Sequence, residues 1–75
     1  MQRYKNLSGN SGIRAYELIG DSIDVEFSGG AVYRYDYATT GRHKVETMKA
    51  LANAGEGLGT FISQHVGDAY AEKLR

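Results

Sequence analysis

The sequence predicts an α+β domain in which a three-stranded antiparallel β-meander precedes two α-helices that pack on one face of the sheet. Three observations support this class. Apolar and polar side chains alternate in three runs between residues 13 and 37, and glycine-containing turns separate the runs. After residue 40 the apolar spacing changes to the helical period of about 3.6 residues. The 75-residue chain has no cysteine, so packing without disulfides must stabilise one small domain.

Turn residues define the bounds of the three expected strands. The first run, Ile13–Ile19, ends at Gly20-Asp21, a dipeptide typical of a two-residue hairpin loop. The second run, Ser22–Phe27, alternates strictly between apolar and acidic side chains. A loop over residues 28–30 then leads into the third run, Ala31–Tyr37.

The alternation also predicts how the strands pair, because a slip of one residue moves every side chain to the other face. With a three-residue loop, Val25 faces Tyr33, and Asp24 faces Arg34 in an opposite-charge pair worth roughly 0.2–1 kcal/mol. A two-residue loop mixes apolar and charged faces, so we reject it. The predicted apolar face consists of Tyr16, Leu18, Ile23, Val25, Phe27, Tyr33, Tyr35 and Tyr37.

The run YRYDY, Tyr33–Tyr37, has two interpretations. Aromatic side chains on an open sheet face stack bases in RNA-binding domains. Here the same face carries Ile23 and Val25, and two amphipathic helices need a surface to cover. We therefore interpret the tyrosines as one wall of the core, with an exposed end at Tyr37.

Two helices are expected after the sheet. The first, Arg42–Ala54, has Thr39 or Thr40 as its expected N-cap, and Gly55 is a natural stop at its C-terminus. The second, Leu58–Leu74, carries a continuous apolar stripe. Both apolar stripes are expected to cover the apolar face of the sheet.

Residues 1–12 are polar and contain two glycines, and we expect them to be a flexible lead-in to a single domain over residues 13–75. The lead-in has no apolar segment of the kind found in signal peptides. No run approaches the roughly 18 apolar residues that indicate a membrane span. We therefore expect a cytoplasmic protein without membrane contact.

No pattern in the sequence indicates catalysis. His65 lies on the apolar stripe of the second expected helix, where a buried core histidine is expected, and His43 is expected in solvent. The two histidines lack metal-type spacing. The glycine run Gly55–Gly59 has neither the preceding strand of a dinucleotide site nor the lysine of a phosphate loop, so we interpret it as a tight joint between helices. We expect no catalytic residue, no metal and no cofactor.

Basic residues offer the candidate contacts for a nucleic acid. Nine basic and nine acidic residues cancel, so the net charge gives no long-range attraction for RNA. A local patch is expected on the first helix, and Arg3 and Lys5 join it if the lead-in folds nearby. The candidate nucleic-acid-binding residues are Arg34, Tyr37, Arg42, Lys44 and Lys49.

The tyrosine motif Tyr33-Arg34-Tyr35 and the later segment Gly59-Thr60-Phe61-Ile62 resemble the KTSC domain, and the likeness runs from about Ser11 to Tyr70. Residues 38–40 depart from the family, which commonly has Val-Pro there, whereas this chain has no proline. The resemblance implies a small free-standing bacterial or phage-type member. The family is named from the C-terminus of some lysyl-tRNA synthetases, which hints at RNA, and no activity carries over. The matching residues are Ile13, Tyr16, Phe27, Tyr33, Tyr35, Phe61 and Ile62.

The sequence thus predicts a non-catalytic binding module for RNA or a ribonucleoprotein. The alternative is a protein-interaction module, or a homodimer without nucleic-acid binding. A small core gains stability from a partner, and the outer strands of a meander have open edges. An enzyme that uses His65 together with a tyrosine ranks last.

Overall fold

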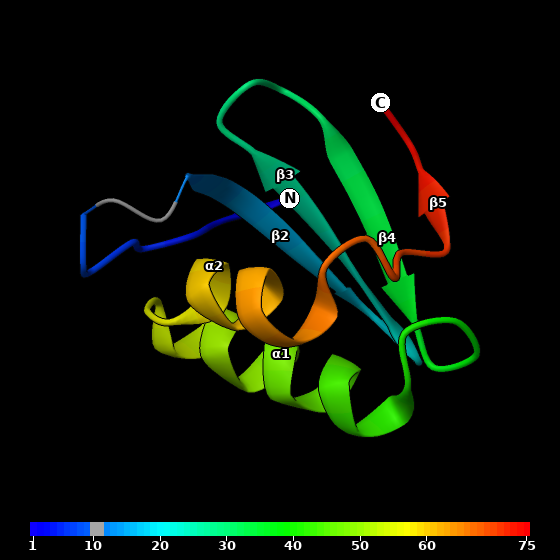
Figure 1. Ribbon diagram of the computed structural model, residues 1–75. Helices are drawn as coiled ribbons and strands as arrows, with labels where there is room; N and C mark the ends of the chain where they lie inside the picture. The colour runs from blue at the N-terminus through cyan, green and yellow to red at the C-terminus, as the bar shows by residue number, and fades with distance from the viewer. Residues whose placement is uncertain (10–11) are drawn as a thin grey trace.

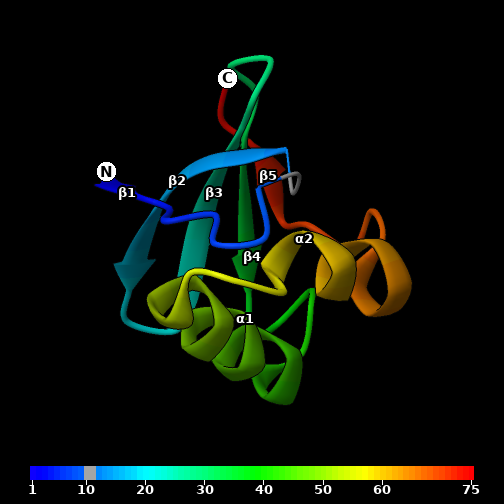
Figure 2. The same cartoon turned by 90° about the vertical axis from the view of Figure 1, so that its left-hand side faces the viewer.

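Five antiparallel strands form one sheet in the order β1-β2-β3-β4-β5, and the helices lie together on one side of it (Figures 1 and 2). This computed structural model describes residues 1–9 and 12–75. The α+β class is confirmed, but the sheet has five strands rather than the three expected. The strands are β1 (Gln2–Arg3), β2 (Ile13–Ile19), β3 (Ser22–Phe27), β4 (Val32–Asp36) and β5 (Glu72–Lys73).

The helical layer consists of two pieces. Helix α1 (Arg42–Ala54) has the expected bounds and packs over β3 and β4. Helix α2 (Leu58–Phe61) continues directly into one turn of π-helix, η1 (Ile62–Val66). No helix in the described part of the chain is long and apolar enough to span a bilayer.

The central strands pair in the register that the alternation predicts. Val25 lies opposite Tyr33, and Asp24 lies opposite Arg34. The left-handed position of the β3–β4 loop falls on Gly30, whose φ of 97° suits a residue without Cβ. The register of β2 against β3 shifts between Ile13 and Ala15, so Arg14 occupies an irregular position at the start of the strand.

The core lies between the sheet and the helices. Ile23, Val25 and Tyr35 are buried, so the central tyrosine is core, as expected. Leu18 is 41% exposed, because α1 packs over β3 and β4 and leaves this edge of the sheet uncovered. The remaining members of the buried cluster are Tyr4, Ile13, Tyr16, Val45, Met48, Ala52, Leu58, Ile62 and Val66.

The second helix is shorter than expected. Its apolar periodicity predicted a helix over Leu58–Leu74, but the helical turns end at Val66. Gly67 has φ 58° and ψ −126°, a conformation that glycine adopts readily and that turns the chain back toward the sheet. Residues 72–73 then pair with β4 as β5, and the Leu74 N–H donates to the Val32 carbonyl at 2.7 Å.

The caps of α1 agree with the prediction at one end only. Gly41, rather than Thr39 or Thr40, occupies the N-cap position. The Thr40 hydroxyl instead donates to the carbonyl of Ala69 at 2.6 Å and ties the start of α1 to the returning chain. At the other end Gly55 adopts the expected left-handed C-cap, with φ 80°.

The N-terminal segment contributes a strand and a core residue, which differs from the lead-in expected over residues 1–12. β1 pairs with Ala15 and Tyr16 of β2, and Tyr4 is only 3% exposed. The Leu7 N–H donates to the Gly55 carbonyl at 2.8 Å, so this segment runs beside the α1–α2 connection (Figure 2). Residues 10–11 belong to the expected lead-in and lie outside the described residues, and Ser11 is also where the stretch resembling KTSC begins.

Replacement of Tyr4 tests whether the N-terminal segment is part of the core. Tyr4→Ala is expected to lower the free energy of unfolding by about 3–5 kcal/mol, as for other buried aromatic residues. Tyr4→Phe removes the hydroxyl that accepts from the Leu58 N–H at 3.3 Å, and it is expected to cost about 0.5–1.5 kcal/mol. Urea unfolding measures both values.

Leu7→Ala is the matched control, because Leu7 is 64% exposed. It is expected to change the free energy of unfolding by less than about 0.5 kcal/mol. Equal stability of Tyr4→Ala and Leu7→Ala would show that residues 1–9 do not pack on the core in solution.

Candidate functional site

An open hollow on the inner face of the sheet is the first candidate site, here called the aromatic groove. Its lining residues come from the β3–β4 hairpin, from η1 and from the turn that follows η1. Its volume is about 440 Å³. Aromatic side chains form much of its wall, and the lining residues are Phe27, Gly29, Ala31, Tyr33, Tyr35, Ile62, Gly67, Asp68 and Tyr70.

The rings of the aromatic groove contact one another at several angles. The centroids of Tyr33 and Tyr70 are 4.6 Å apart in a tilted pair, and Phe27 meets Tyr33 edge-on at 5.8 Å. Tyr70 also meets Tyr35 edge-on at 6.4 Å. The ammonium of Lys73 lies 5.9 Å from the centroid of Tyr33, within the range of a cation–π contact. The groove therefore offers ring faces and one cation to a flat ligand.

The early end of the helix at Gly67 leaves this part of the sheet open. A helix continuing to residue 74 would place the later residues in the helical layer instead of on the sheet. Instead the chain leaves η1, and Tyr70 comes to lie against Tyr33 and Tyr35. The alternation predicted that Tyr33 lies in the core wall, whereas the structure leaves it half-buried in the groove.

Tyr35 forms the floor of the aromatic groove. Burial raises the pKa of its hydroxyl to about 12, and the neighbouring Tyr33 and Tyr70 add to this effect. The neutral phenol is therefore the form that the folded chain favours.

Three of the predicted site residues meet at the start of α1. The Tyr37 hydroxyl donates to Glu46 Oε2 at 2.5 Å, while Arg42 Cζ and Lys49 Nζ lie 5.8 Å and 5.9 Å from the Tyr37 ring centroid. The hydrogen bond raises the pKa of Tyr37 and lowers the pKa of Glu46. Lys49 also donates to the carbonyl of Gly20, and its side chain is only 15% exposed. This lysine is thus engaged within the protein.

The other two predicted residues lie apart from this cluster. Arg34 is on the opposite face of the sheet, where its guanidinium donates to both carboxylate oxygens of the buried Asp24 at 2.7 Å and 2.9 Å. This pairing raises the pKa of Arg34. Lys44 is exposed on α1. The five residues therefore do not form one surface.

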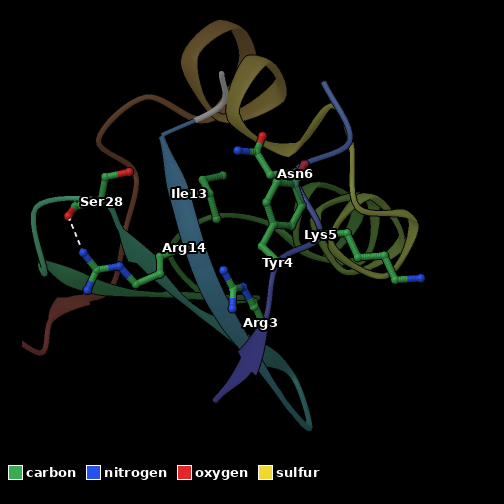
Figure 3. A pocket seen from close by; sticks show the side chains of 7 residues that line it. All are labelled: Arg3, Tyr4, Lys5, Asn6, Ile13, Arg14 and Ser28. Carbon is green, nitrogen blue, oxygen red and sulfur yellow. Dashed lines mark hydrogen bonds between the residues drawn. The ribbon is translucent and has the colours of Figure 1, made fainter. Parts of the chain in front are cut away.

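A second hollow, here called the arginine cavity, lies where the N-terminal segment separates from β2 (Figure 3). Its volume is about 300 Å³. Arg14 donates to the Ser28 carbonyl at 2.7 Å and to Glu26 Oε2 at 3.3 Å. The sequence predicted that Arg3 and Lys5 join a basic patch on the first helix if the lead-in folds nearby, and no local pattern indicated that β1 pairs with β2. The lining residues are Arg3, Tyr4, Lys5, Asn6, Ile13, Arg14 and Ser28.

Within residues 1–9 and 12–75, no group of three or more His, Cys, Asp or Glu side chains is arranged to hold a metal ion. His65, expected in the core, is exposed and its ring lies 5.1 Å from the Phe61 ring centroid. Ile62 and Val66 are the buried residues of η1, so His65 lies on the exposed side of this turn.

Comparison with protein-family models, with curated proteins and with solved structures found no match. The resemblance to the KTSC domain stays a prediction.

The raised pKa of Tyr35 predicts a loss of stability at high pH. The folded chain holds this proton more tightly than the unfolded chain, whose tyrosine pKa is about 10. The contribution of the Tyr35 hydroxyl to the stability of the folded chain is complete below about pH 10 and disappears as the pH rises toward 12. We expect it to reach roughly 2–3 kcal/mol, because one pKa unit corresponds to about 1.4 kcal/mol.

Tyr35→Phe keeps the ring and removes the titrating group. Urea unfolding of both proteins between about pH 9 and pH 12 measures the effect. The free energy of unfolding of the natural chain is expected to fall more steeply than that of the variant. Parallel curves would contradict a buried neutral phenol at the floor of the groove.

Proposed function

We propose that the chain is a small non-catalytic module that binds single-stranded RNA by stacking a base in the aromatic groove. The observation that carries this proposal is the set of ring faces from Phe27, Tyr33 and Tyr70 around an open hollow of about 440 Å³. Aromatic side chains hold unpaired bases in this way, and every base has a π face to offer.

The charges around the aromatic groove fit a ligand that is held mainly by stacking. Lys73 places one cation over Tyr33, and Asp68 adds one carboxylate to the lining. With a net charge of zero, the chain gains little from long-range attraction to phosphates. We therefore expect modest affinity that decreases further as salt is added.

The resemblance to the KTSC domain supports the aromatic groove as the binding site. Of the seven residues that carry the likeness, four line the aromatic groove: Phe27, Tyr33, Tyr35 and Ile62. The link between that family and some lysyl-tRNA synthetases agrees with an RNA ligand. Lys44 is an exposed cation on α1 that remains a candidate for phosphate contacts, whereas Arg42 lies over the Tyr37 ring and Arg34 is already paired with Asp24.

A protein partner is the second candidate, and the edge of β2 favours it. Among the described residues, β1 pairs only with Ala15 and Tyr16. Beyond them the backbone of residues 17–19 forms an open edge, and Leu18 is exposed beside it. An open strand edge accepts a further strand from a partner or from a second copy of the chain.

Removal of the Tyr70 ring tests the RNA proposal. Tyr70→Ala is expected to weaken binding of a short mixed-sequence single-stranded RNA by roughly 5- to 150-fold, the loss that corresponds to about 1–3 kcal/mol of base stacking. Tyr70→Phe keeps the ring and is expected to bind normally. Amide NMR titrations at low and moderate salt report the affinity and the residues that respond.

Tyr37→Ala is the comparison variant, because Tyr37 belongs to the cluster at the start of α1 instead of the groove. Weaker binding of Tyr37→Ala together with normal binding of Tyr70→Ala would move the site to α1. No response to RNA at low salt would contradict the proposal. In that case, a mass that rises with concentration, with shifts at Leu18, would favour self-association at the β2 edge.

A further inference from the structure

We propose that the arginine cavity is an anion-binding site that takes a phosphate group. This proposal does not depend on the aromatic groove or on RNA. It stands on the cavity built by the N-terminal segment, on the cations that line it and on the absence of carboxylates from its described lining.

The fold brings Arg3 and Arg14 to the lining of one cavity from different strands. β1 pairs with β2 so that Arg3 lies opposite Ala15, and the Tyr4 N–H donates to the Arg14 carbonyl at 2.9 Å. Figure 3 shows the side chains of Arg3 and Arg14 on the same side of Tyr4, with Lys5 extending away on the other side. Asn6 then turns the chain with a positive φ of 55°.

Arg14 is held in place without losing its capacity to bind. The Ser28 carbonyl and Glu26 accept hydrogen bonds from two of its terminal N–H groups, and the side chain is still 57% exposed. A guanidinium has five N–H donors in a fixed plane. Fixing the group beforehand lowers the entropy that a bound anion must overcome.

The charge in this region is only partly compensated. Glu26 is shared, because its carboxylate also lies 3.5 Å from the guanidinium of Arg75. Within the described residues, no ion pair joins Arg3 or Lys5 to a carboxylate. Arg3, Lys5 and Arg14 are thus the cations that line this space of about 300 Å³, and Glu26 beside Arg14 is a shared counter-charge. The Lys5 side chain extends away from the two arginines (Figure 3).

The chemistry of the lining selects a phosphate group over a small halide. The lining carries two guanidinium groups, and a guanidinium presents planar pairs of donors that match the oxygens of phosphate. The phosphate can be free, or it can belong to a nucleic-acid strand. Ser28 lines the arginine cavity and Gly29 lines the aromatic groove, so a strand in the groove passes near the cavity.

The first arm of the test is a titration of the full chain with inorganic phosphate, followed by the amide and arginine side-chain NMR signals. Saturable shifts are expected at Arg3, Arg14 and Ser28. Arg3→Gln and Arg14→Gln are each expected to weaken binding about 10- to 100-fold, as for hydrogen bonds to charged groups. Arg42→Gln is the matched control, because it removes the same charge from an exposed position on α1 and is expected to bind normally.

Arg14→Lys separates guanidinium geometry from charge, since lysine keeps the charge without the planar pair of donors. It is expected to bind more weakly than the natural chain, and circular dichroism checks that each variant is folded. Linear, unsaturated shifts, or equal losses in Arg42→Gln and Arg14→Gln, would overturn the proposal.

The second arm uses a short single-stranded RNA and identifies the source of the phosphate. Shifts in both the cavity and the aromatic groove assign it to a strand, whereas a response of the cavity to inorganic phosphate alone assigns it to a free anion. Saturable phosphate binding without RNA binding supports this proposal and contradicts the proposed function. RNA binding by the aromatic groove without any response of the arginine cavity supports the proposed function and contradicts the anion-binding proposal.

Discussion

The reversal of the chain at Gly67 is the constraint on which the rest of the structure depends. Its backbone conformation ends the helical layer and returns the chain to the sheet. Tyr70 then packs on Tyr33, and β5 covers the edge of β4. The same reversal leaves the inner face open beside the β3–β4 hairpin. One glycine therefore determines both the fifth strand and the aromatic groove.

The two ends of the chain complete a sheet that would otherwise have three strands. β1 and β5 are each two residues long, which is typical of sheet edges that resist pairing with other chains. Each also brings side chains to a hollow. The N-terminal segment supplies Arg3 to the arginine cavity, and the C-terminal segment supplies Tyr70 to the aromatic groove. The β3–β4 loop borders both hollows.

The sequence predicts the centre of this fold well and its ends poorly. Strict alternation in β3, together with the pairing of Asp24 with Arg34, determined the register, because a shorter loop would mix apolar and charged side chains on one face. The length of the second helix was wrong, since the apolar period continues to Ala69 although Gly67 ends the helix. Strands β1 and β5, each of two residues, are too short to show an alternation of apolar and polar side chains. The contacts of Tyr70 and Arg3 depend on these long-range pairings, so local patterns did not reveal either hollow.

The most direct test of this account is a measurement of nuclear Overhauser effects around Tyr70 in the natural chain. The account predicts contacts between the ring protons of Tyr70 and those of Tyr33, and between the backbones of Lys73 and its β4 partner Tyr33. A helix that continues through Gly67 would instead give contacts between residues three apart along residues 66–72. That result would contradict the presence of both β5 and the aromatic groove.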